Sequence, residues 1–265
     1  WHLADELTEM IALHDASNIA AVIVEPMAGS AGVIPPPAGY LQRLRDICTA
    51  NDILLIFDEV ITGFGRCGAM TGADAFGVVP DIITFAKGVT SGYVPLGGYA
   101  VSDRFLDEIS GESANGNIYS NGYTWSGNPV ACAAALASWD IIEQENLLAH
   151  VQEVAPYFQS QLRTLLDIPL VGDVRGTGLM AAIEMRLEND ERGARLLAQD
   201  YAIGELVDNY CHQFGLLVRP LINVCIMSPP LIITREQIDD MVSALRQALL
   251  LAQADLEDDN NFFPA

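Results

Sequence analysis

The first half of the sequence contains a series of short apolar runs that are separated by amphipathic segments. Four runs have the length and composition of buried strands: residues 19–26, 53–60, 81–87 and 96–102. Residues 39–52, between the first two runs, place Leu41, Leu44, Ile47 and Cys48 on one face of a helix. Strands that alternate with helical crossovers predict an α/β fold with a mainly parallel sheet.

Polar residues stand at the ends of three of these apolar runs. Glu25 lies at the end of the first run, Asp58 near the end of the second and Lys87 at the end of the third. In parallel α/β sheets, ligands bind beyond the carboxyl ends of the strands. We therefore predict that these three side chains lie at the same edge of the sheet, at a ligand site.

The pattern changes after a long helix, which we expect to begin at Pro129 because proline is favoured in the first helical turn. Short strands and helices follow and predict a smaller α+β domain, with domains at 1–145 and 146–265. Thr234 and Gln237 have capping-box spacing and predict the start of the last helix. The other elements expected in this part are helices at 149–166 and 193–213 and strands at 171–176, 179–185, 216–221 and 224–230.

Composition excludes several classes of protein. Thirteen basic and 35 acidic residues give a net charge of −22, which argues against a nucleic-acid or anionic-membrane partner. No apolar run approaches the ~18 residues that a membrane span requires. The five cysteines are scattered and form no CxxC pair, which favours a reducing, cytoplasmic location over a disulfide framework or zinc site. We expect no metal site.

Lysine is almost missing from the chain. Of the 13 basic residues, 12 are arginines and one is a lysine, Lys87. Arginine can replace lysine as a surface charge but cannot form an imine, because its guanidinium stays protonated. The single lysine beside a strand end therefore favours a covalent role for a primary amine. The alternative is that the other lysines were lost and this one remained by chance.

Asp58 and Lys87 lie 29 residues apart, at the ends of successive predicted strands. A carboxylate there can keep a pyridinium nitrogen protonated, which pyridoxal phosphate requires when it acts as an electron sink. The alternative for Asp58 is a loop cap, the usual role of an aspartate after a strand. The GFGRCG segment at 63–68 matches the GxGxxG pattern, but the glycines and proline that follow leave no room for the helix of a dinucleotide site.

Four longer motifs carry a family resemblance: VIVEPMAGSAGV (22–33), LLIFDEVITGFGR (54–66), DIITFAKGVTSGYVPLGG (81–98) and YTWSGNPVACAAALA (123–137). The chain resembles the class III, fold type I, pyridoxal-phosphate-dependent aminotransferases over nearly its whole length. Within them it is most similar to the ω-amino acid (β-alanine):pyruvate transaminases. The resemblance implies a fold type I large domain followed by a small domain. It also implies amino transfer from an ω-amino acid or amine to pyruvate or a similar keto acid.

The resemblance implies cofactor roles for individual residues. Lys87 would bind pyridoxal 5′-phosphate covalently, and Asp58 would pair with the ring nitrogen. Val60 would pack on the ring, and we place Glu25 in the same cofactor site. Thr124 would bind the cofactor phosphate of the neighbouring subunit, so the active unit would be a homodimer or a dimer of dimers.

Substrate binding is assigned to Arg219 and Tyr123 by the same resemblance. Arg219 matches the arginine that receives the α-carboxylate and moves aside for bulky amines, and a carboxylate is a natural bidentate partner of a guanidinium. Ser30 stands where ornithine-type members carry a glutamate, which favours the ω-amino acid branch over those substrates.

Two alternatives stay open at this point. An aminomutase, racemase or decarboxylase on the same scaffold would use the same lysine and aspartate. A truncated, non-catalytic chain that only assembles with a partner is the second. The sequence begins at Trp1, and the phosphate-binding region that the family has upstream is not present before it, so we expect an N-terminally incomplete chain.

Overall fold

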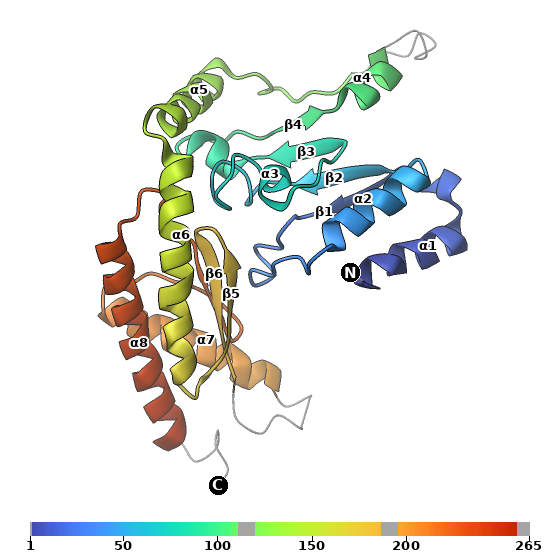
Figure 1. The fold of residues 1–265 in the computed structure, drawn as a ribbon. Coiled ribbons are helices and arrows are strands. Elements are labelled where there is room, and N and C mark those ends of the chain that lie inside the picture. The colour runs from blue at the N-terminus through green and yellow to red at the C-terminus, as the bar shows by residue number, and fades with distance from the viewer. Residues whose placement is uncertain (1, 111–119, 187–195, 259–265) are drawn as a thin grey trace. The chain divides into compact units, whose positions relative to one another are not determined.

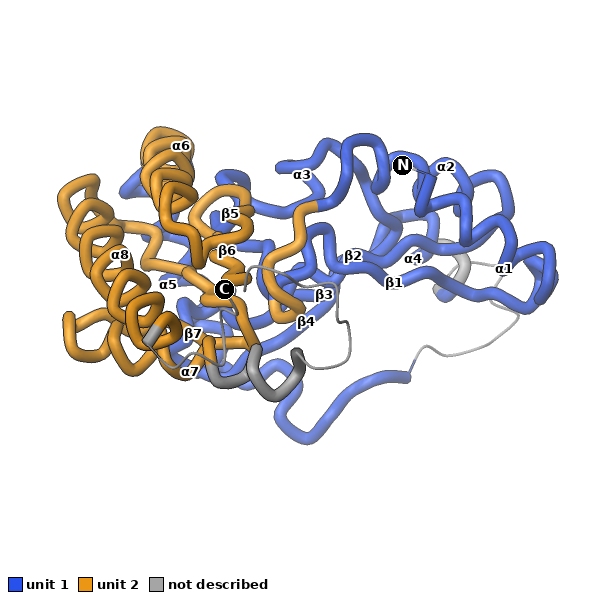
Figure 2. The backbone as a smooth tube through the Cα atoms, turned by 90° about the horizontal axis from the view of Figure 1, so that it is seen from below, with its two compact units in different colours: residues 1–29, 36–148 blue, residues 30–35, 149–265 orange. Residues whose placement is uncertain are grey.

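The structure is a computed structural model that describes residues 2–110, 120–186 and 196–258 (Figure 1). The chain divides into two compact units (Figure 2). Unit 1 contains residues 1–29 and 36–148, and unit 2 contains residues 30–35 and 149–265. The predicted boundary near residue 145 places residues 30–35 with the first domain, whereas the contacts group them with unit 2. Separate domains at 1–145 and 146–265 stay a prediction.

Unit 1 is built on a four-stranded sheet in the order β1-β2-β3-β4 (Figure 1). Strands β1 and β2 are parallel, β2 and β3 are parallel, and β4 is antiparallel to β3. The sheet is therefore mainly parallel, as predicted. The elements of this unit are η1 (His2–Asp5), α1 (Glu6–His14), η2 (Ala16–Asn18), β1 (Ala21–Val24), α2 (Tyr40–Ala50), β2 (Leu54–Asp58), α3 (Gly72–Phe76), β3 (Ile82–Phe85), η3 (Lys87–Thr90), β4 (Gly98–Val101), α4 (Asp103–Ser110) and α5 (Pro129–Gln144).

The core of unit 1 lies around β2. Leu55 and Phe57 on this strand are completely buried. They are two residues apart, so their side chains point to the same, covered face of the sheet. Helix α2 buries Leu41, Leu44, Ile47 and Cys48, the face that the sequence periodicity predicts. Helix α5 begins at Pro129, also as predicted, and Asn128 caps it by accepting hydrogen bonds from the N–H groups of Val130 and Ala131.

Unit 2 contains a four-stranded antiparallel sheet in the order β5-β6-β8-β7, with helices packed against it. Its elements are α6 (Leu147–Arg163), η5 (Thr164–Asp167), β5 (Val171–Thr177), β6 (Met180–Met185), α7 (Leu196–Gln213), β7 (Arg219–Leu221), β8 (Val224–Met227) and α8 (Arg235–Asp258). Residues 193–195 of the predicted 193–213 helix lie outside the described residues. None of the described helices is long and apolar enough to cross a membrane.

The last helix begins with the capping box that the sequence predicts. Thr234 Oγ1 accepts a hydrogen bond from the N–H of Gln237 at 3.3 Å, and Gln237 Oε1 accepts one from the N–H of Thr234 at 3.0 Å. Two N–H groups that would otherwise lack partners are thereby satisfied. Helix α8 then buries Ile238, Val242 and Leu245 in the core of unit 2, which also contains residues of the sheet.

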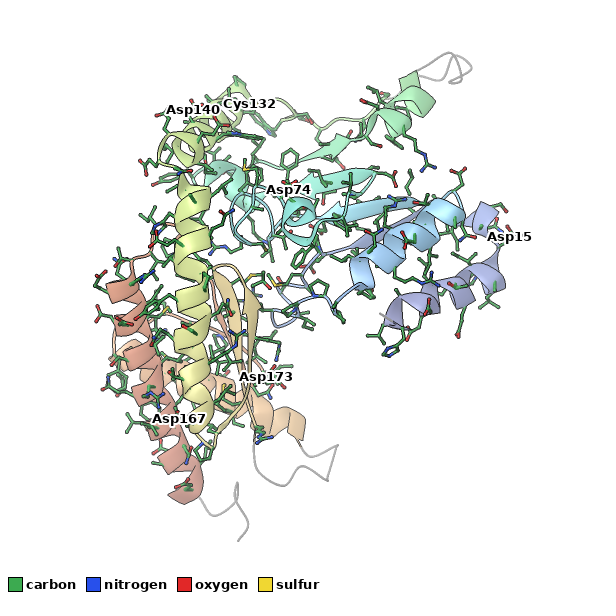
Figure 3. The ribbon with its side chains drawn as sticks, viewed as in Figure 1. Asp15, Asp74, Cys132, Asp140, Asp167 and Asp173 are labelled. Carbon is green, nitrogen blue, oxygen red and sulfur yellow. The ribbon has the colours of Figure 1, made fainter. Side chains whose placement is uncertain are left out.

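Arg175 on β5 holds residues 30–35 in unit 2. Its Nε donates hydrogen bonds to the carbonyl oxygens of Gly32 at 3.0 Å and Val33 at 3.1 Å. Its Nη1 pairs with Asp173 (Figure 3) and Glu184. Burial lowers the pKa of Arg175, but these two carboxylates outweigh it and raise the pKa above the ordinary value. The guanidinium is therefore a permanent donor to a segment more than 140 residues away in sequence.

Gly204 on α7 allows a close approach of the β7–β8 turn. A Cβ at this position would lie 2.0 Å from the carbonyl oxygen of Ile222, whose own φ is 59°. We expect Gly204→Ala to lower the free energy of unfolding by about 2 kcal/mol, since this overlap outweighs the gain of about 1 kcal/mol in helix propensity. Denaturant unfolding measures the change. Glu205→Ala at the exposed neighbouring position is the control, and an equal effect of both variants would contradict the prediction.

Candidate active site

The carboxyl ends of β1, β2 and β3 lie next to one another at one edge of the unit 1 sheet (Figure 1). Val24, the last residue of β1, pairs with Phe57, and Asp58, the last residue of β2, pairs with Thr84, one residue before the end of β3. Glu25 follows β1 directly, and Lys87 follows Thr84 by three residues. The two parallel ladders thus bring the predicted strand-end residues to the same edge, where α/β sheets bind ligands.

Asp58 is half-buried and makes a local turn. Its Oδ1 accepts a hydrogen bond from the N–H of Val60 at 3.1 Å, as an Asx turn does. The loop-cap role considered from the sequence is thus present in the structure. Within the described part of the chain, Oδ2 has no hydrogen-bond partner. One oxygen of the carboxylate caps the strand end, and the other can receive a proton donor.

Lys87 begins the short helix η3 with an exposed side chain. Its φ is 42°, in the left-handed region that few residues other than glycine occupy. Such a conformation is unfavourable by itself and persists only where the surrounding structure imposes it, often at functional sites. The carbonyl of Lys87 accepts a hydrogen bond from the N–H of Gly92 at 3.2 Å, and Thr90 Oγ1 donates to the carbonyl of Val94 at 2.6 Å.

Glu25 and Ile61, the residue after Val60, both contact Gly29 in the turn after β1. Glu25 Oε2 accepts a hydrogen bond from the N–H of Gly29 at 2.9 Å, which closes the turn after β1. Ile61, one residue beyond Val60, fills the space beside Gly29: a Cβ on Gly29 would lie 2.7 Å from its Cδ1. The loops after β1 and β2 therefore pack directly against each other.

Glu59 is a residue of this region whose role the sequence reasoning missed. Its side chain is 1% exposed and accepts hydrogen bonds from Thr62 Oγ1 at 3.1 Å, from the N–H of Ala73 at 2.8 Å and from the N–H of Gly72. The carboxylate thus satisfies the first donors of α3, on which Asp74 lies (Figure 3). The two neighbouring carboxylates therefore differ: Asp58 is half-buried at the end of β2, whereas Glu59 is buried.

Cys67 in the same loop is buried and does not suit a nucleophilic role. Burial raises the pKa of its thiol to about 12, and the charge of Glu59 adds to this effect. A thiol with this pKa is protonated near neutral pH, and the thiolate is the reactive form. Among the residues near the strand ends, Lys87 is therefore the better candidate for covalent chemistry.

Tyr123 and Thr124 lie in an exposed turn before α5. The N–H of Tyr123 donates to Ser126 Oγ at 2.8 Å, and the N–H of Ser126 donates to the carbonyl of Tyr123 at 2.9 Å. The Tyr123 and Trp125 side chains are 84% and 77% exposed. Thr124 is thus presented on a turn of fixed shape, with its side chain exposed in this chain.

Arg219 is the first residue of β7 in unit 2, and its side chain is exposed. Backbone pairing with Ile226 fixes its position on the β7–β8 hairpin. Asn223 in the hairpin turn donates from Nδ2 to the carbonyl of Met185 at 2.7 Å and accepts from the N–H of Met185 at 2.8 Å. These bonds join the turn to the end of β6, so the backbone under Arg219 is held on two sides.

The amine of Lys87 and the carboxylate of Asp58 are the two types of group that pyridoxal phosphate requires. The cofactor needs a primary amine for covalent attachment and a carboxylate that stabilises a protonated ring nitrogen. The Lys87 amine has no hydrogen bond or ion pair within the described part of the chain, and Asp58 Oδ2 is likewise available. Both groups stand at the carboxyl ends of adjacent parallel strands.

Comparison with known proteins identifies the family. A model of the class III aminotransferases matches residues 2–249. An omega-aminotransferase from Caulobacter vibrioides is 47% identical over 249 residues, which are 94% of this chain and 55% of that protein. A beta-alanine–pyruvate aminotransferase from Pseudomonas aeruginosa is 52% identical over 185 residues, which are 69% of this chain and 41% of that protein.

Solved structures agree with this result. The crystal structure of an amine transaminase from an uncultivated Pseudomonas species, in its PLP-bound form, has a TM-score of 0.88 and 44% identity to this chain. The match covers 95% of this chain and 56% of that one. The chain belongs to the class III aminotransferases, a family of pyridoxal-phosphate-dependent transaminases with an α/β fold of type I. The predictions of family and fold class are confirmed. The chain spans about half the length of the curated relatives it matches.

Proposed function

We propose that this chain carries the catalytic lysine and aspartate of a transaminase that moves an amino group from an ω-amino acid or amine to pyruvate or a similar keto acid. The observation that supports the proposal most is the position of Asp58 and Lys87 at adjacent parallel strand ends. The names of the similar proteins favour pyruvate as the acceptor, since one of them is a beta-alanine–pyruvate aminotransferase.

The proposed roles follow from the chemistry of each side chain. When bound, pyridoxal phosphate supplies an electron sink for the charge left on the donor carbon. Asp58 Oδ2 stabilises a proton on the ring nitrogen, and the Lys87 amine, once free, moves a proton at the donor carbon as general acid and base. Val60 and Glu25 shape the cofactor site from neighbouring loops. Arg219 binds the keto-acid carboxylate, with Tyr123 beside the substrate.

Assembly and location are part of the same proposal. The exposed turn with Thr124 supports a homodimer or dimer of dimers in which this residue reaches a neighbouring cofactor phosphate. The five cysteines, none of which forms a disulfide, support a reducing, cytoplasmic location.

A half-reaction experiment tests the proposal. The purified protein is loaded with pyridoxal phosphate and mixed with β-alanine or an amine, without a keto acid. Transamination leaves pyridoxamine phosphate and a carbonyl product in equal amounts. Addition of pyruvate then converts the pyridoxamine phosphate back to pyridoxal phosphate. An aminomutase, racemase or decarboxylase regenerates pyridoxal phosphate instead, and a non-catalytic chain gives neither product.

The two halves of the reaction also test Arg219. We expect Arg219→Ala to raise the KM for pyruvate about 30-fold, which corresponds to about 2 kcal/mol, the lower end for a lost charge pair because the side chain is exposed. The first half-reaction with an amine that lacks an α-carboxylate should change much less. Stopped-flow measurement of each half-reaction separates the two effects. Equal losses in both halves would assign Arg219 to the fold or to the cofactor.

A further inference from the structure

The backbone conformation of Lys87 needs a cause in the surrounding structure, and Phe64 lies against the next residue. A Cβ on Gly88 would lie 3.0 Å from the Cβ of Phe64 and 3.4 Å from its ring atom Cδ2. The Phe64 ring also meets the Phe85 ring edge-on, with centroids 5.9 Å apart. One aromatic side chain thus contacts the residues on both sides of the Ala86–Lys87 pair.

Phe64 itself is held by a tightly folded loop. Its φ is 57°, again in the left-handed region. The N–H of Phe64 donates to the carbonyl of Met70 at 2.7 Å, and the N–H of Gly65 donates to the carbonyl of Ala69 at 3.1 Å. The Phe64 ring is therefore supported by its own backbone as well as by packing.

Glu59 fixes both ends of this loop. Its backbone N–H donates to the carbonyl of Thr84 on β3 at 2.8 Å, and its buried carboxylate binds the N–H groups of Gly72 and Ala73 at the far end. The loop from Glu59 to Ala73, here called the 59–73 loop, is thus closed by one side chain. Glu59 directly follows Asp58, so the same loop starts beside one proposed catalytic residue and packs against Gly88, the residue after the other.

We propose that the 59–73 loop positions Lys87: Glu59 closes the loop, and Phe64 packs against Gly88 and Phe85 to keep the Lys87 backbone left-handed. The inference rests on the proposed function for its consequence in catalysis. Glu59 and Phe64 are positioning residues, because they act on the loop and on the segment around Lys87 and are not proposed to touch substrate or cofactor. The Phe64 ring also meets the Trp139 ring of α5 edge-on, with centroids 6.2 Å apart. A displacement of reacting groups by about 1 Å can cost up to about 10²-fold in rate.

The first test uses the protein without cofactor. The N–H groups of Val89 and Ser91 donate to the carbonyls of Ala86 and Gly88, so hydrogen exchange of residues 86–92 reports on this conformation. Phe64→Ala should speed this exchange at least fivefold. Phe76→Ala is the matched control: it removes another partly buried phenylalanine of unit 1, in the core around β2, and should leave exchange at 86–92 within twofold of the wild type.

Glu59→Gln tests the other end of the loop with little change in shape. An amide cannot accept all the hydrogen bonds that the carboxylate accepts. We expect faster exchange at Gly72 and Ala73, and a smaller increase at 86–92 than Phe64→Ala gives. Unchanged exchange at 86–92 in both Phe64→Ala and Glu59→Gln would overturn the inference.

The second test measures covalent attachment of pyridoxal phosphate to Lys87 by borohydride trapping and peptide mass mapping. Phe64→Ala should slow attachment about tenfold, whereas acetylation of Lys87 by acetic anhydride should stay at the wild-type rate because the amine remains exposed. Gly88→Ala should also slow attachment, and the double variant should lose less than the product of the two single losses. Independent, multiplying losses would contradict the proposed contact.

The two proposals can fail separately. If the wild-type protein forms no covalent adduct, the proposed function is wrong, and hydrogen exchange still decides whether the loop holds residues 86–92. If attachment occurs but is equally fast in Phe64→Ala and Phe76→Ala, the function stands and the positioning role is wrong.

Discussion

Lys87→Arg should abolish covalent binding of pyridoxal phosphate and reduce transamination by more than about 10³-fold. Arginine keeps the positive charge but cannot form an imine, so the expected loss is chemical and not electrostatic. Because Lys87 is the single lysine of the 265 residues, borohydride trapping should modify one side chain within this sequence. Peptide mass mapping locates the adduct, and a rate assay with β-alanine and pyruvate measures the loss.

A matched control tests whether the position of Lys87, and not merely the presence of a primary amine, determines where the cofactor attaches. Arg104→Lys adds a second exposed amine on α4, where Arg104 pairs with Asp52. Trapping should still modify Lys87 and leave residue 104 unmodified, since α4 follows the antiparallel strand β4 and lies at the end of the sheet opposite to Asp58. Normal transamination by Lys87→Arg, or an adduct at residue 104 comparable to that at Lys87, would contradict the assignment.

The regular part of the fold could be predicted because it depends on local signals. Apolar runs located the strands, while Pro129 and the capping-box residue Thr234 located two helix starts. The sequence did not specify that β4 is antiparallel to β3. That direction agrees with the content of the connection: the 12 residues between Phe85 and Gly98 contain only the short helix η3, whereas a parallel crossover usually contains a full α-helix.

The parts that could not be predicted depend on contacts between distant residues. Residues 30–35 join unit 2 because Arg175 binds their carbonyl oxygens, a contact across more than 140 residues that no local pattern indicates. Glu59 was missed for a similar reason. Its partners Gly72 and Ala73 follow 13 and 14 residues later. They bind the carboxylate through backbone N–H groups, so their residue types do not indicate the contact.

The candidate site lies between these two cases. The order of strands placed Asp58 and Lys87 at adjacent strand ends, and the register of β2 with β3 agrees with that placement. The left-handed conformation of Lys87 could not be foreseen, because no local pattern indicates it; we propose that packing by Phe64 and the 59–73 loop keeps a non-glycine residue in it. The sequence thus indicated the proposed reacting groups, whereas their local backbone conformation became apparent only in the structure.

Asp58→Asn should reduce kcat/KM by about 10²-fold or more while the protein keeps its stability. The hydrogen bond from the N–H of Val60 goes to Oδ1, and the amide oxygen of asparagine can accept the same bond. The turn after β2 therefore survives, and what is lost is the negative charge that stabilises a protonated ring nitrogen. Losses of this size are typical when one electrostatic group is removed from an active site.

Asp58→Ala completes this comparison because it removes both the charge and the cap. If Asp58 serves the cofactor, both variants lose activity to a similar extent, and Asp58→Ala alone also loses about 1 kcal/mol of stability, as expected for a lost neutral hydrogen bond. If Asp58 is only a cap, Asp58→Asn keeps its activity within about fivefold, and Asp58→Ala is the damaging change. Steady-state kinetics and denaturant unfolding of the two variants distinguish these outcomes, since Asn preserves the turn and Ala does not.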